Sequence, residues 1–141
     1  MRTLLLRLIL FVIILTTLVA GVIGYLSSEQ ALRAGIWIYG AQTIELTPLG
    51  DYLIRMLASG LIALGLLNIL AFLNPRRYRH IILVDAIMLV LRALQRVLSA
   101  NVIVDAFGVS AFRLYTNAGV MLVLSVALIW LSWGNPSRRR S

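Results

Sequence analysis

The chain of 141 residues contains no cysteine and only five acidic residues, and arginine supplies all 13 of its basic side chains because lysine is absent. The lack of cysteine excludes structural disulfides, thiol catalysis and cysteine-bound metal clusters. Two interpretations of the arginine usage stay open. One is a genome rich in G and C, and the other is a preference for the planar guanidinium that binds carboxylate or phosphate through two hydrogen bonds.

Apolar residues make up 61% of the chain, and the mean hydropathy of +0.96 is too high for a soluble domain of this size. A membrane-spanning helix needs about 20 mostly apolar residues. The sequence therefore predicts one all-α membrane domain over 1–141, an antiparallel bundle of four transmembrane helices with a small extracytoplasmic cap. The four predicted spans cover residues 4–26, 48–73, 75–98 and 111–133.

The first apolar run also resembles a secretory signal peptide, because Arg2 and Arg7 precede or flank it. Its length and the poor cleavage site at Leu18-Val19-Ala20 favour a retained first span. Nucleic-acid binding is not expected despite the net charge of +8, because no basic fold or aromatic stacking platform accompanies the charge.

Most arginines fall on one side of a four-span topology. The positive-inside rule then places both termini in the cytoplasm, and the segments 27–51 and 99–113 outside. The three arginines near the C-terminus are expected to clamp a cytoplasmic surface of a partner. The arginines on the cytoplasmic side are Arg2, Arg7, Arg76, Arg77, Arg79, Arg138, Arg139 and Arg140.

Charged residues recur on one face of the third predicted span. Arg92 and Arg96 lie seven and eleven positions after Asp85. Each of the two arginines falls within roughly 20° of Asp85 on a helical wheel. Each would cost about 2.5–3.5 kcal/mol at the bilayer centre if it faced lipid. This face is therefore expected to point into protein.

The outer half of the predicted bundle gathers several polar side chains that suit a partner or an anion. Guanidinium groups bind a lipid phosphate, a carboxylate or an acidic side chain of another subunit. The alternative is pairing within the chain, with Asp51, Asp105 and Glu45 as the acids. The candidate binding residues are Arg55, Arg92, Gln95, Arg96, Arg113 and Asn117.

Three further residues are candidates for chemistry. Asp85, the only acid deep in a span, suits a proton carrier or, alternatively, a residue bonded to Asn68, to Arg79 or to a neighbouring chain. His80, at the cytoplasmic boundary, suits a pigment ligand or a contact with lipid head groups. Trp37 suits a pigment or quinone site, and alternatively an aromatic residue at the outer membrane interface.

Local signals predict where elements begin and end. Thr47 and Pro48 favour a helix start, and Asp51 lies in its first turn. The residues over 36–39 and over 42–46 are of types that favour strands, and Gly40 and Ala41 join them. This pattern predicts a β-hairpin over residues 36–46, in the extracytoplasmic cap.

Enzyme signatures are absent from the sequence. No serine, threonine or acid is spaced with His80 as a catalytic triad requires, and there is no glycine-rich phosphate loop or metal-spaced histidine–glutamate set. We therefore expect neither catalysis nor a metal site.

Four sets of residues within roughly residues 50–130 carry a resemblance to known proteins: Arg55, Gly60 and Gly65, Asn-Pro-Arg-Arg-Tyr-Arg at 74–79, Leu-Arg-Ala-Leu-Gln-Arg at 91–96 and Asp-Ala-Phe-Gly at 105–108. In these features the chain resembles the small four-span bacterial proteins of the DoxX-like and BphX-like groups. The chain lacks the cysteine and redox features of DoxX itself, so no such activity carries over. The resemblance implies a four-helix architecture in a bacterial inner membrane.

These observations favour a non-catalytic accessory subunit of a larger respiratory or photosynthetic inner-membrane complex. Its expected partners are other integral membrane subunits and bound lipid, with pigment or quinone as further ligands. The alternative is a small carrier or binding protein for an anionic or lipid-like ligand held by the arginines. A carrier requires a cavity that reaches the midplane, whereas a scaffold is packed shut there.

Overall fold

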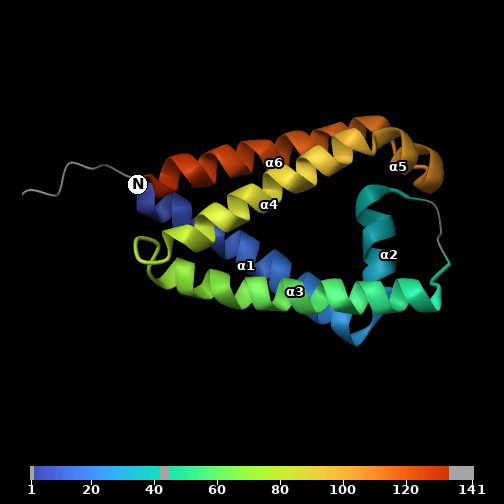
Figure 1. The fold of residues 1–141 in the computed structure, drawn as a ribbon, viewed down its shortest axis with the longest axis horizontal. Coiled ribbons are helices and arrows are strands. Elements are labelled where there is room, and N and C mark those ends of the chain that lie inside the picture. Colours follow the sequence, from blue (N-terminus) through green and yellow to red (C-terminus); the bar gives the residue numbers. More distant parts are fainter. Residues whose placement is uncertain (1, 42–44, 134–141) are drawn as a thin grey trace, which may run out of the picture.

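The structure is a computed structural model, and it describes residues 2–41 and 45–133. These residues form six helices and no strand (Figure 1). The predicted all-α fold is confirmed. The helices are α1 (Arg2–Leu26), α2 (Ser28–Tyr39), α3 (Pro48–Leu73), α4 (Arg79–Leu98), α5 (Ala100–Phe107) and α6 (Ala111–Ser132).

Three helices, α1, α3 and α6, are long and apolar enough to cross a membrane. Large apolar side chains such as Leu15, Leu66 and Val123 lie exposed on their outer surfaces. A helical membrane protein carries this pattern because lipid, rather than water, surrounds such side chains. The α4 helix has 20 residues but differs from the other three in carrying Asp85, Arg92 and Arg96.

The α3 helix begins as the sequence predicts. The Thr47 side-chain hydroxyl accepts a hydrogen bond from the backbone N–H of Gly50 at 3.1 Å, and Pro48 occupies the first turn. The helix ends at Asn74, whose side-chain oxygen accepts a bond from the backbone N–H of Arg77 at 3.3 Å in the turn that follows. This tight turn places the end of α3 beside the start of α4 (Figure 1).

The β-hairpin predicted over 36–46 is wrong in its first arm, which forms the last turn of α2. The Ser27 side chain caps the start of this helix by accepting a bond from the backbone N–H of Gln30. Gly40 ends it in a left-handed conformation, with φ of 64°, which glycine adopts without steric cost. Helix capping thus overrides the β-branched and aromatic run. Residues 42–44, in the second arm, lie outside the described residues.

The helices form two similar halves, each a long helix, a short helix and a second long helix (Figure 1). In the first half α1 packs along α3, and in the second half α4 packs along α6. These two pairings are the most extensive in the molecule, whereas contacts between the halves are sparse. The halves meet at the end where α1 begins and diverge towards the end that carries α2 and α5 (Figure 1).

The hydrophobic core lies at the end where the halves meet. Leu10 from α1, Ala71 from α3, Ile82 from α4 and Leu128 from α6 are fully buried there and belong to one cluster. All four long helices thus contribute to a core at one end. The opposite end holds no comparable cluster among the described residues, and a cavity occupies the space between the halves there.

Candidate ligand-binding cavity

A cavity of about 550 Å³ lies between the two halves, at the end opposite the core. All six helices contribute to its wall. Small residues create this space, because α1 contributes Ala20 and Gly24, and α2 contributes Ala31 and Gly35. A Cβ atom added at Gly35 would meet no atom within 4 Å, so this part of the wall is open.

The cavity extends to about the middle of the helical bundle. Its deepest residue on α3 is Leu61, which follows Pro48 by 13 positions. At a rise of 1.5 Å per residue, Leu61 lies about 20 Å along a helix of 26 residues that is about 39 Å long. The cavity therefore runs from the end of the molecule to the midpoint of its longest helix.

Among the described residues of the wall, Arg96 is the only charged one, and the others are apolar residues or glycine. It lies in the last turn of α4 and is partly buried. A guanidinium keeps its charge at all physiological pH values and carries five N–H donors in a planar fork that matches carboxylate and phosphate. The cavity thus combines a long apolar space with a single fixed positive charge near its outer end.

The other predicted binding residues do not join Arg96 in the described cavity wall. Arg55 is exposed on α3, and its Nε atom lies 3.1 Å from the Asp51 carboxylate. Its Nη1 atom also donates to the backbone oxygen of Tyr25 at 3.2 Å, which ties α3 to the end of α1. The pairing of Arg55 with Asp51 is thus the internal alternative that the sequence left open. Gln95 is exposed, and Arg92 and Asn117 are partly buried.

Arg113 lies in the first turn of α6 and reaches across to the end of α2. Its guanidinium lies against Gly40, the residue that ends α2. Backbone carbonyl groups at a helix C-terminus carry partial negative charge, which a nearby cation stabilises. Arg113 therefore connects the two halves across the outer end. The six predicted residues are distributed over separate contacts, and Arg96 alone faces the cavity.

Asp85 is buried at the boundary of α3 and α4. Its Oδ1 atom accepts a hydrogen bond from the Asn68 side-chain amide at 3.2 Å, and both residues are almost fully buried. The other oxygen atoms of this pair, Asp85 Oδ2 and Asn68 Oδ1, have no hydrogen-bond partner among the described residues. Nearby, the Ser125 hydroxyl of α6 donates to the backbone oxygen of Ala86 at 3.0 Å. These two hydrogen bonds connect α4 to α3 and to α6.

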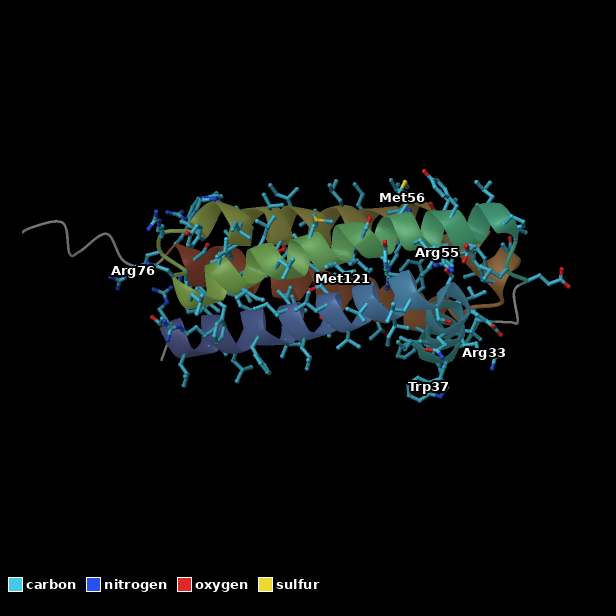
Figure 2. All side chains as sticks on the ribbon, turned by 90° about the horizontal axis from the view of Figure 1, so that it is seen from below. Arg33, Trp37, Arg55, Met56, Arg76 and Met121 are labelled. Atoms are coloured by element: carbon cyan, nitrogen blue, oxygen red, sulfur yellow. The ribbon has the colours of Figure 1, made fainter. Side chains whose placement is uncertain are left out.

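His80 and Trp37 lie outside the cavity wall. His80 is exposed, and its ring approaches the Tyr78 ring edge-on at 6.2 Å between centroids. Trp37 is 84% exposed and points away from the bundle, at the end that also carries Arg55 (Figure 2). Within the described chain no three histidine, cysteine or acidic residues group as a metal site would require. Arg138, Arg139 and Arg140 lie outside the described residues.

Sequence reasoning missed the cavity itself. Its signal is a set of small residues at helical spacing on two different helices: Ala20 and Gly24, and Ala31 and Gly35. The sequence predicts the first segment as a helix, but it predicts a hairpin from residue 36 onwards, directly after the second set, so the two sets are not predicted to lie opposite each other.

Comparison with protein-family models, with curated proteins and with solved structures found no match to this chain.

Proposed function

We propose that the chain is a membrane protein of four spans that binds an amphiphile with an anionic head group in the cavity. The observation that carries this proposal is the combination of an apolar cavity of about 550 Å³ with the single arginine Arg96 in its wall. A cavity of this size accommodates one hydrocarbon chain with a small head group. The proposed role is binding, without a chemical step.

The α4 helix supports the fourth span. The chain leaves α3 at one end of the bundle and enters α6 at the other end, and α4 covers this distance alongside α6 (Figure 1). Its 20 residues extend about 30 Å, which equals the thickness of a hydrocarbon core. Ile87, Leu91 and Leu94 share an exposed face, whereas Asp85 is buried. An apolar outer face and a buried charge suit a helix surrounded by lipid on one side.

The proposed topology predicts that residues 77 and 101 lie on opposite sides of a bacterial inner membrane, with residue 77 in the cytoplasm. Because the natural chain has no cysteine, Arg77→Cys and Asn101→Cys each introduce a single thiol. A membrane-impermeant maleimide added to intact spheroplasts should label position 101 but not 77, and inside-out vesicles should give the reverse. Labelling of both positions from the same side would exclude α4 as a span.

The head group is expected to determine which amphiphile binds. A hydrocarbon tail entering the cavity leaves lipid of similar polarity, so its burial contributes little free energy. A carboxylate or phosphate bonded to a guanidinium in a site with little water gains much more. The tail would follow Leu57 and Leu61 towards the bundle centre, with the head group at Arg96.

This proposal is tested by comparing ligands that differ only in charge. The purified protein in a mild uncharged detergent should bind a spin-labelled long-chain carboxylate, and the alcohol of equal chain length should compete at least about tenfold less well than the unlabelled acid. Native mass spectrometry should show one amphiphile per chain. Equal competition by acid and alcohol would contradict the proposed role of the head group.

An accessory subunit of a larger membrane complex is a second candidate. A Cβ atom added at Gly60 or at Gly119 would meet nothing within 4 Å. Exposed glycines on transmembrane helices allow the close approach of a helix from another subunit. Stoichiometric larger subunits in the same native mass spectra, lost on Gly60→Leu substitution, would favour this role over solitary binding.

A further inference from the structure

At the end of the molecule opposite the cavity, two guanidinium groups lie over tryptophan rings. The Cζ atom of Arg2, at the start of α1, lies 4.0 Å from the ring centroid of Trp130. The Cζ atom of Arg79, at the start of α4, lies 5.4 Å from the ring centroid of Trp133. Trp130 lies in the last turn of α6 and Trp133 directly follows the helix, so arginines from two other helices lie over rings at the end of α6.

The contact with an indole ring leaves each guanidinium able to make a second interaction. A cation over the face of the ring gains cation–π attraction. The guanidinium also carries five N–H donors, which match the oxygen atoms of a phosphate. Each ring therefore favours one position of a guanidinium whose N–H groups can bind an anion.

An apolar crevice accompanies the contact of Arg2 with Trp130. It has a volume of about 430 Å³ and is lined by Arg2, Val126, Ile129 and the two tryptophans. Tryptophan is typical of the membrane–water interface, where its ring lies at the level of the lipid head groups. A phosphate at Arg2 would thus have apolar surface beside it for the first part of an acyl chain. A free phosphate ion would make no use of this surface.

The positive charge of this end also favours an anionic partner. The described arginines here include the two over tryptophan rings and Arg76, which projects from the end of the molecule (Figure 2). The five acidic residues of the chain lie elsewhere, and the nearest along α4 is the buried Asp85. The cytoplasmic leaflet, where the positive-inside rule places this end, carries anionic lipid. The full set of described arginines at this end is Arg2, Arg7, Arg76, Arg77 and Arg79.

We propose that Arg2 and Arg79, held by Trp130 and Trp133, form a site for the phosphate head group of one anionic phospholipid at the cytoplasmic surface. This site lies at the opposite end from the cavity and involves none of its residues. It rests on the proposed membrane topology but not on ligand binding in the cavity, so the two proposals fail separately.

The test uses the full-length protein in an uncharged detergent, titrated with phosphatidylglycerol or phosphatidylcholine and followed by native mass spectrometry. Phosphatidylglycerol should bind to one high-affinity site, and phosphatidylcholine should bind there at least about tenfold more weakly. The double variant Arg2→Gln/Arg79→Gln should lose the preference. The matched variant Arg76→Gln/Arg77→Gln removes the same charge from the same end and should keep it.

A second variant distinguishes the shape of the guanidinium group from its positive charge. Arg2→Lys/Arg79→Lys preserves the net charge but replaces the planar fork by point charges, and its affinity should also fall by about tenfold. Unchanged affinity in the lysine variant, or equal losses in the two glutamine variants, would show diffuse attraction and overturn the site. Displacement of the lipid by millimolar inorganic phosphate would likewise overturn the lipid as occupant. Circular dichroism of each variant confirms that the helices are intact.

Discussion

Replacing Gly21 by leucine is expected to disrupt the packing of α1 against α3. A Cβ atom at this position would lie 2.8 Å from the Ile62 side chain, 3.0 Å from the Ile62 backbone nitrogen and 3.1 Å from the Ala58 backbone oxygen. Two of these three atoms are backbone atoms, which cannot move aside without displacing the whole helix. Overpacking of this kind costs typically about 1–3 kcal/mol, and a leucine that meets backbone lies at the upper end.

The measurement is the thermal or detergent-induced unfolding of the purified protein, followed by circular dichroism. Gly60→Leu on α3 is the matched control, because a Cβ atom there would meet nothing within 4 Å. The stability of this variant in isolation should equal or slightly exceed that of the natural chain, since leucine favours a helix over glycine by about 1 kcal/mol. Equal destabilisation by the two substitutions would contradict the close α1–α3 contact.

Replacing Arg96 by glutamine is expected to lower the affinity for a long-chain carboxylate by about tenfold to a hundredfold. The substitution keeps a polar side chain of moderate size but removes the one charge among the described residues of the cavity wall. Binding of the alcohol with the same chain length should change little, because its head group carries no charge. This difference between two ligands distinguishes a lost ion pair from a disturbed fold.

Arg92→Gln is the control for this prediction. Arg92 lies on the same helix, four residues before Arg96, and is also partly buried, but it does not line the described cavity. Its replacement should leave the preference for acid over alcohol unchanged. If Arg92→Gln reduced the acid affinity as strongly as Arg96→Gln, the effect would come from the positive charge of α4 in general rather than from the cavity.

The apolar helices could be predicted from the sequence because their hydrophobic runs are long and the start of α3 carries strong capping signals. The end of α2 was wrongly predicted as a strand, because Ile36, Trp37 and Ile38 are residue types that favour strands. Ser27 and Gly40 decide the outcome, since one caps the helix start and the other adopts the left-handed conformation at its end. Capping residues at both ends of a short segment thus deserve more weight than the type of residue between them.

The arginines that were predicted to share one site could not be placed from the sequence. A helical wheel shows which residues share a face of one helix, but it gives no information on the angle between two helices. Here the two halves diverge at the outer end, so Arg55 bonds within the first half while Arg96 faces the cavity. Arg113 instead reaches Gly40 across the gap. The pattern predicted which residues were unusual, and the packing of the halves determined what each one contacts.

The division of core and cavity between the two ends has a consequence for motion. The two halves pack together through a hydrophobic core at one end, and the cavity lies between them at the other end. An occupant of the cavity would contact both halves and so favour one angle between them, in addition to the contact of Arg113 with Gly40 that connects the halves at this end. By thermodynamic linkage, whatever binds there and whatever changes this angle must influence each other equally. Bilayer thickness and lateral pressure act on such an angle, so the membrane itself would tune the affinity.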